Sequence, residues 1–147
     1  MADSTKSSVS INAAPAEVLD VIADFDGYPE WTGQIKKAEV LSEDEQGWPL
    51  EVQLTLDAGV IKDTYVLAYT WDVAEDGTGV VSWNLVKSSI LKALDGVYRL
   101  TGDGDTTNVT YELSVDLSIP VIGMIRRKAE KTIIDTALKG LKKRVEG

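Results

Sequence analysis

The sequence has no cysteine and no histidine among its 147 residues. Without cysteine, the chain forms no disulfide and offers no thiolate nucleophile or thiolate metal ligand. Without histidine, it lacks the most frequent general base and the most frequent metal ligand of proteins. The acidic residues are spread over predicted strand faces and turns, so we expect no bound metal and no redox cofactor. An enzyme built from this chain would have to work with Asp, Glu, Lys, Tyr and Ser, which favours a role without catalysis.

Long apolar segments are also missing. No stretch reaches the roughly 18 consecutive apolar residues that a membrane span needs, and the polar segment from Met1 to Ser8 lacks the apolar region of a secretory signal. We therefore expect a cytoplasmic protein. The net charge of −9 and the pI of about 4.5 argue against nucleic-acid binding, because contacts to phosphate dominate that affinity.

The charge is unevenly distributed along the chain. Residues 121–147 hold eight basic and three acidic residues, a balance of +5, so the remainder carries −14. The favoured interpretation is a solvated helix face, since basic residues near a helix C-terminus interact well with the helix dipole. The alternative is a transient contact of this basic helix with an anionic surface or an acidic partner.

The order of predicted elements is the most informative feature that is present. A first strand covers Lys6–Asn12, a helix begins at Pro15, and a short helical turn covers Tyr28–Trp31. A length of 147 residues is typical of one domain, which we expect to span residues 1–147. Alternating apolar and polar residues then predict six further strands, at Gln34–Leu41, Trp48–Leu56, Lys62–Val73, Val80–Lys87, Ala93–Thr101 and Thr107–Leu117.

One long amphipathic helix closes the chain, from Val121 to about Glu146, and the Ile119-Pro120 pair opens it. An apolar stripe at spacings of three and four residues marks its buried side. The stripe consists of Ile122, Ile125, Ala129, Ile133, Ala137 and Leu141.

These elements predict an α+β fold in which a curved antiparallel sheet of six to seven strands wraps around the long C-terminal helix. Two short helices follow the first strand. The segment Thr107–Leu117 has one polar and one apolar face, so the sheet is open to water on one side and covered by the last helix on the other. Such a helix-grip arrangement encloses a cavity, which points to an apolar ligand.

Strand parity and the helix stripe identify the residues that face this cavity. Four Trp and five Tyr supply large apolar faces with a few polar groups, which is typical of a small-molecule pocket. The predicted ligand-pocket residues are Leu54, Leu56, Tyr65, Leu67, Tyr69, Trp71, Trp83, Leu85, Tyr98, Tyr111, Leu113, Ile125, Ala129, Ile133 and Ala137.

Four segments resemble those of a known group of proteins. The segments Val9–Val18 and Asp24–Trp31, with their Ala-Pro-x-x-Val and Tyr-Pro-x-Trp patterns, are similar to the opening of the START-like (SRPBCC) superfamily. Gly96–Leu100 followed by Thr106–Leu113 resembles a strand pair of its polyketide cyclase/dehydrase and lipid-transport branch. The resemblance implies the helix-grip fold, and also a bacterial housekeeping protein. Within it, Pro15, Pro29, Tyr28 and Trp31 are interpreted as architectural residues.

The resemblance leaves the function open, because this superfamily includes carriers, aromatase/cyclases, quinone-binding chaperones, plant allergens and regulators. The first hypothesis is binding or transport of a hydrophobic small molecule such as a lipid, an isoprenoid quinone or a polyketide. The second is a metal-free polyketide aromatase/cyclase or dehydratase using the phenol of Tyr65, Tyr69 or Tyr98, although no pattern selects one of them. The third is a protein-interaction module whose cavity has collapsed.

Overall fold

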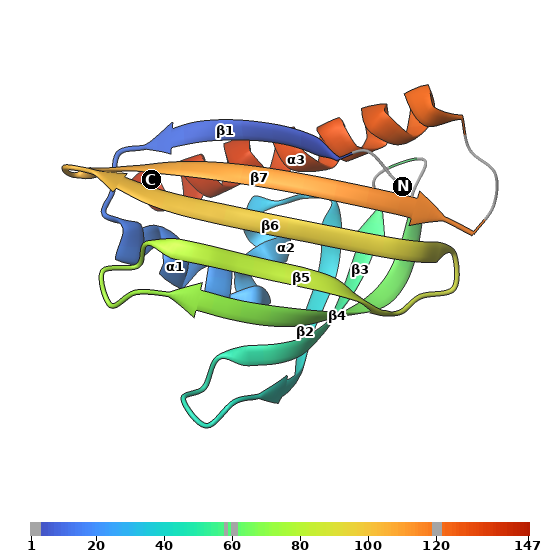
Figure 1. Ribbon diagram of the computed structural model, residues 1–147, viewed down its shortest axis with the longest axis horizontal. Helices are drawn as coiled ribbons and strands as arrows, with labels where there is room; N and C mark the ends of the chain where they lie inside the picture. The colour runs from blue at the N-terminus through green and yellow to red at the C-terminus, as the bar shows by residue number, and fades with distance from the viewer. Residues whose placement is uncertain (1–3, 58, 60–61, 119–121) are drawn as a thin grey trace.

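Seven strands form one antiparallel sheet in the computed structural model, which describes residues 4–57, 59, 62–118 and 122–147 (Figure 1). Their order across the sheet is β1-β7-β6-β5-β4-β3-β2, so consecutive strands from β2 to β7 are neighbours and β1 lies beside β7. The strands are β1 (Thr5–Ile11), β2 (Ile35–Glu43), β3 (Pro49–Asp57), β4 (Lys62–Val73), β5 (Gly79–Lys87), β6 (Leu91–Asp103) and β7 (Thr106–Leu117).

The predicted strands all occur, and their ends differ from the predicted ends by at most two residues. At the β2–β3 hairpin, for example, Ser42 and Glu43 belong to β2 rather than to the turn. The reason is that the carboxylate of Asp44 closes the turn by accepting hydrogen bonds from the backbone N–H groups of Gln46 (2.8 Å) and Trp48 (2.9 Å). Residues 58, 60 and 61, between β3 and β4, lie outside the described residues.

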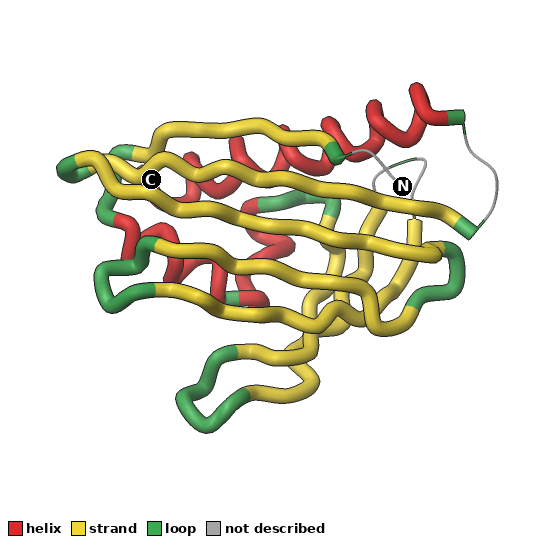
Figure 2. The backbone as a smooth tube through the Cα atoms, viewed as in Figure 1, coloured by secondary structure: helices red, strands yellow, loops and turns green. Residues whose placement is uncertain are grey.

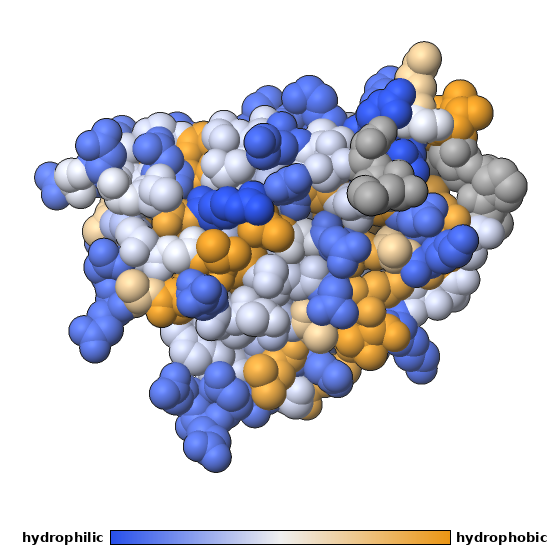
Figure 3. Space-filling view, viewed as in Figure 1, coloured by the Kyte–Doolittle hydropathy of each residue, from blue (hydrophilic) through white to orange (hydrophobic). Residues whose placement is uncertain are grey.

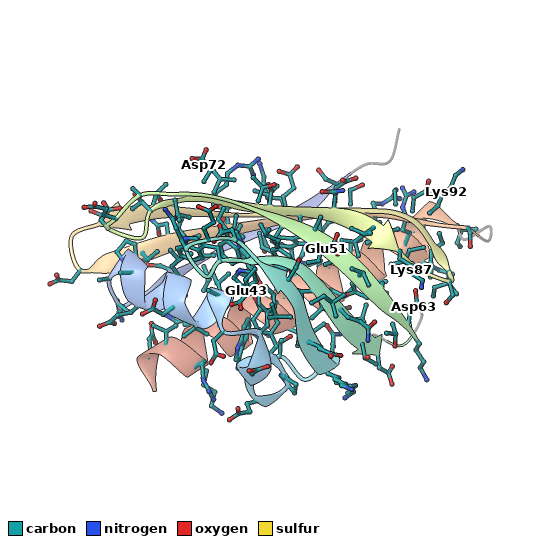
Figure 4. The ribbon with its side chains drawn as sticks, turned by 90° about the horizontal axis from the view of Figure 1, so that it is seen from below. Glu43, Glu51, Asp63, Asp72, Lys87 and Lys92 are labelled. Atoms are coloured by element: carbon teal, nitrogen blue, oxygen red, sulfur yellow. The ribbon has the colours of Figure 1, made fainter. Side chains whose placement is uncertain are left out.

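The helices cover one face of the sheet. The backbone tube in Figure 2 shows the strands in yellow, with α1 (Pro15–Ala23) and α2 (Tyr28–Trp31) behind them. The short 3-10 helix η1 (Phe25–Gly27) joins these two, and the long α3 (Gly123–Glu146) lies against β1, β7, α1 and α2. Figure 4 shows this layering edge-on, with Asp72 and Lys92 projecting from the side of the sheet away from the helices. The predicted helix-grip fold is therefore confirmed.

The outer face of the sheet is largely polar. Figure 3 shows separated apolar patches between polar side chains on this face. Leu41 and Val86 are exposed at 46% and 51%, and both border a shallow hollow over β2 to β5. The inner face carries the apolar residues of each strand, as the alternation in β7 predicts.

The buried side of α3 differs from the predicted stripe. Ile122, just before the helix, and Ile125, in its first turn, are 64% and 40% exposed, because this end of α3 extends beyond the strands that it covers (Figure 1). The buried residues of α3 are Ala129, Glu130, Ile134, Ala137, Leu138 and Leu141. The Ile119-Pro120 pair and Val121 lie outside the described residues.

Glu130 lies on the buried side of α3, where hydropathy alone predicts an apolar residue. Its carboxylate is fully buried, and it accepts hydrogen bonds from the Thr5 hydroxyl (2.8 Å) and the Val115 backbone N–H (2.7 Å). Val115 lies beyond the last β7 residue that pairs with the described part of β1, so this N–H has no strand partner on that side among the described residues. A buried carboxylate with hydrogen-bond partners thus replaces an apolar residue at the edge of β7.

The outward side of α3 carries its basic residues. Lys131 pairs with Asp135 (3.1 Å) and Lys142 with Glu146 (2.7 Å) within the helix, and Arg144 contacts Glu30 of α2 (3.3 Å). This arrangement agrees with a solvated helix face, and a contact with an anionic surface stays a prediction. None of the helices in the described parts of the chain is both long enough and apolar enough to cross a membrane.

Candidate functional site

A cavity of about 60 Å³ lies between the inner face of the sheet, the α2–β2 segment and α3. Strands β3 to β7 supply one wall, and the helices and the start of β2 supply the other. The lining residues are Tyr28, Trp31, Thr32, Gln34, Ile35, Leu54, Leu56, Tyr65, Leu67, Tyr69, Trp83, Leu94, Tyr98, Tyr111, Leu113, Val115, Ile133 and Ala137.

Cross-strand pairing brings the aromatic rings of the sheet together. Tyr98 of β6 lies directly opposite Tyr111 of β7, and their ring centroids are 4.6 Å apart. Tyr69 of β4 lies opposite Trp83 of β5, with centroids 5.5 Å apart. Trp83 also approaches Tyr98 at 5.2 Å. The four rings form a continuous aromatic wall across four neighbouring strands, at distances typical of favourable aromatic pairs.

Gly96 makes room for the indole of Trp83. These two residues are paired between β5 and β6, and a Cβ atom at position 96 would lie 2.2 Å from the Trp83 ring. The ring therefore lies flat against the backbone of β6. Glycine at this position lets the aromatic wall stay close to the sheet and leaves space in front of it for the cavity.

The α2 helix supplies the opposite wall with two more rings. Tyr28 and Trp31 lie edge to face with centroids 4.8 Å apart. The Tyr28 hydroxyl donates a hydrogen bond to the Ile22 carbonyl oxygen, which ties α2 to the end of α1. The sequence predicted an architectural role for both residues. The structure shows this packing and places both side chains in the cavity lining as well.

None of the described residues that line the cavity has a charged side chain. Burial raises the pKa of Tyr98 above the usual tyrosine value, and burial followed by the charge of Asp63 does the same for Tyr65. The pKa values of Tyr69 and Tyr111 are also raised, by burial and by neighbouring tyrosines. The four phenols therefore stay protonated at neutral pH and act as neutral hydrogen-bonding groups. Within the described residues, no three acidic side chains cluster as a metal site would require.

Most of the predicted pocket residues lie around this cavity. Eleven of the fifteen are in its lining: Leu54, Leu56, Tyr65, Leu67, Tyr69, Trp83, Tyr98, Tyr111, Leu113, Ile133 and Ala137. Whether these residues contact a ligand stays a prediction.

The other four predicted residues lie elsewhere, which corrects the predicted lining. The indole of Trp71 stacks on Trp48 (4.9 Å) and donates to the Pro49 carbonyl (2.6 Å), so it belongs to the β2–β3 end of the sheet. Leu85 follows the last β5 residue that pairs with β6 and is only half-buried. Ile125 is exposed on the first turn of α3, and Ala129 is buried outside the cavity.

Seven lining residues were not predicted. Leu94 and Val115 share the inward parity of Tyr98 and Leu113, so strand alternation carried a signal for both. Thr32 and Gln34 come from the turn between α2 and β2, where hydropathy gives no direction for a side chain. Ile35 is the first residue of β2, and a register shift between Ile35 and Lys37 interrupts the strand alternation there. The remaining two are Tyr28 and Trp31.

The fold and the enclosed aromatic cavity define a helix-grip protein. Within this class, the chain belongs to the family described as Polyketide cyclase / dehydrase and lipid transport, whose family model matches residues 11–142. No relative was found among curated proteins.

Solved structures of similar fold come from several bacteria. A START superfamily protein from Mycobacterium smegmatis is 22% identical, with a TM-score of 0.87 and 97% of each chain covered. The Zhui aromatase/cyclase from a Streptomyces species is 17% identical, with a TM-score of 0.81 and coverage of 99% of this chain and 94% of that one. A STAR-related lipid transfer protein from Xanthomonas axonopodis is 19% identical, with a TM-score of 0.79 and coverage of 98% and 86%. At these identities the likeness shows the fold.

Proposed function

We propose that this protein binds or transports a hydrophobic small molecule, such as a lipid, an isoprenoid quinone or a polyketide, in the cavity between the sheet and α3. The observation that carries the proposal is a lining of mainly apolar and aromatic side chains that both layers of the fold supply, with no charged group among the described lining residues. Such a surface favours an apolar molecule, because its burial removes apolar area from water without leaving a charge unpaired.

The size of the cavity constrains how the ligand enters. A volume of about 60 Å³ has room for only a few water molecules, since one water needs roughly 10–15 Å³ on this measure. Ligand pockets for drug-sized molecules are typically about 300–1,000 Å³. A lipid or polyketide therefore requires the lining to move outward on binding. Gln34, Ile35 and Ile133 are the half-buried members of the lining, so this side of the cavity is the least covered.

Catalysis by a polyketide aromatase/cyclase or dehydratase is the second candidate. The observation that favours it is the set of four buried phenols, because a protonated phenol donates a hydrogen bond to a substrate carbonyl. The same raised pKa values disfavour proton abstraction by Tyr65 or Tyr98 near neutral pH. Binding alone needs no such base, and we therefore place it first.

Native mass spectrometry of the protein purified from its own host tests the proposal directly. We expect a retained apolar molecule, and its mass names the ligand class. In parallel, a fluorescent fatty acid, a quinone and a polyphenol are titrated into the wild type and into Ala137→Phe, which fills the cavity from α3. The matched control is Ala16→Phe on the exposed side of α1.

Three outcomes are distinguishable. Binding that is lost in Ala137→Phe and kept in Ala16→Phe supports the cavity as the site. Conversion of a poly-β-ketone substrate by the wild type favours the cyclase or dehydratase. If the host protein retains nothing and none of the three probes binds, the proposal is refuted and a protein-interaction module becomes the better interpretation.

A further inference from the structure

Two polar atoms in the cavity lining have no hydrogen-bond partner among the described residues. One is the indole Nε1–H of Trp31, a side chain that is only 9% exposed. The other is the amide oxygen Oε1 of Gln34. One atom is a donor and the other an acceptor, and both residues line the cavity. A buried polar atom without a partner is costly, so such atoms in a folded protein call for an explanation.

The two residues come from one short segment of the chain. Trp31 ends α2, and Gln34 follows in a turn that the hydrogen bond from the Ile35 N–H to the Thr32 carbonyl (3.0 Å) closes. The Gln34 carbonyl in turn accepts a hydrogen bond from the Asp57 N–H (2.7 Å), which fixes the turn to the end of β3. The donor and the acceptor therefore lie at the same end of the cavity, on a segment that is held at both ends.

Two other polar side-chain groups, of Trp71 and Tyr28, do have hydrogen-bond partners. The indole N–H of Trp71 donates to the Pro49 carbonyl, and the Tyr28 hydroxyl donates to the Ile22 carbonyl. Across the described residues, Nε of Arg126 is the third buried side-chain atom without a partner, and Arg126 is not part of the cavity lining. The two fully buried polar side-chain atoms of the lining that lack a partner among the described residues therefore both lie at the α2–β2 end.

We propose that this end of the cavity is a polar subsite that binds a neutral hydroxyl group of the ligand, which accepts from Trp31 Nε1–H and donates to Gln34 Oε1. This inference rests on the proposed function and deepens it. A hydroxyl matches both atoms at once, whereas a ketone only accepts and a carboxylate finds no cation in the lining. The seven aromatic rings around the cavity suit a flat apolar body. The ligand class is therefore a phenol, an aromatic molecule with at least one free hydroxyl.

The experiment compares three ligands that share one aromatic body: 2-naphthol, 2-methoxynaphthalene and naphthalene. Their binding to the wild type is measured by calorimetry at pH 7, where a phenol with a pKa near 10 is neutral. We expect 2-naphthol to bind at least about tenfold more tightly than naphthalene, because a site built for a hydroxyl rejects the analogue without one. The methoxy compound keeps the acceptor and loses the donor, so we expect an intermediate affinity.

Two variants locate the subsite. Trp31→Phe keeps an aromatic ring and removes the N–H donor, and Gln34→Leu replaces the amide by an apolar side chain and so removes the acceptor. We expect each to reduce the preference for 2-naphthol over naphthalene to less than about threefold. The matched controls are Trp48→Phe and Gln53→Leu, which change residues outside the cavity lining and should keep the wild-type preference. Gln34 is only half-buried, so Gln34→Leu remains informative if Trp31→Phe is unstable.

The outcomes separate the subsite from the proposed function. If all three ligands bind the wild type with equal affinity, the subsite is refuted while binding of apolar molecules stands. The same holds if the preference persists in both Trp31→Phe and Gln34→Leu. If none of the three binds while a fatty acid or a quinone does, the phenol class is refuted and the cavity function remains. If no apolar probe binds at all, both proposals are overturned.

Discussion

Replacing Gly140 by alanine tests whether α3 packs directly on the backbone of α2. An ideal Cβ atom at position 140 would lie 1.8 Å from the carbonyl oxygen of Trp31 and 2.9 Å from its carbonyl carbon. Real Cβ atoms essentially never approach another heavy atom within 3.0 Å. The two helices must therefore move apart by more than an ångström. The obstacle is backbone, so a change of side-chain rotamer does not relieve it.

Two opposing effects set the magnitude of this substitution. Alanine in the interior of a helix is favoured over glycine by roughly 1 kcal/mol. Overpacking costs roughly 1–3 kcal/mol, and a clash with backbone belongs at the upper end of that range. We therefore expect a net loss of about 2 kcal/mol in the free energy of unfolding. For a chain of this size that loss corresponds to a decrease of about 8 °C in the Tm.

Gly123→Ala in the first turn of the same helix is the matched control. There the added Cβ atom would lie 3.1 Å from a guanidinium nitrogen of Arg127, which is the end of a flexible side chain. We expect a change within about 0.5 kcal/mol. Urea unfolding followed by circular dichroism measures both variants. If Gly140→Ala is as stable as the wild type, α3 does not pack directly on Trp31 and the geometry of this wall of the cavity is wrong.

Two further predictions concern buried and partly buried acids. Glu130→Leu should lower the free energy of unfolding by roughly 1–3 kcal/mol in urea titrations, since it leaves the Val115 N–H without its acceptor. Glu130→Gln should cost less, since the amide oxygen still accepts that bond, and equal losses would contradict this explanation. The pKa of Asp63 is subject to burial, which raises it, but hydrogen bonds from Ser88 and Ser89 outweigh burial and lower it. Its stabilising contribution is therefore present above about pH 4 and lost as the pH falls through the lowered pKa. In thermal unfolding from pH 2 to 7, Asp63→Asn should lose less stability on acidification than the wild type. Identical profiles of Tm against pH would contradict the lowered pKa of Asp63.

The fold was predictable because the alternation of apolar and polar residues in each strand shows which side chains face inward. In Thr106–Leu117 the residues with inward parity, such as Tyr111 and Leu113, are buried, while Glu112 between them is half-buried and pairs with Arg99 (3.0 Å). A period of two leaves only one choice of inner face for each strand. Because the connections between successive strands are short, these strands pair in antiparallel fashion. The helix order and the short connections then leave one covered side of the sheet.

The polar end of the cavity was not predictable in this way. Thr32 lies in a turn, where no periodicity fixes the direction of a side chain. Gln34 was predicted as the first residue of a strand, but β2 begins at Ile35 and Gln34 lies in the same turn as Thr32. The resemblance predicted an architectural role for Trp31, and its ring does pack on Tyr28. Only the three-dimensional structure shows that the indole N–H of Trp31 lacks an acceptor among the described residues. An unmet hydrogen bond is a property of the surroundings of a side chain, and a sequence pattern does not contain those surroundings.

The α3 residues of the cavity wall also show what the sequence could not predict. Ala129, Ile133 and Ala137 follow one another at intervals of four residues, and the sequence treated them as one face. Each interval of four turns an ideal helix by about 40°, so Ala129 lies about 80° around the axis from Ala137 and about 12 Å further back along it. Ile133 and Ala137 line the cavity, whereas Ala129 is buried outside it. A bulky side chain at position 137 fills the cavity, while the same side chain at position 129 meets closely packed protein.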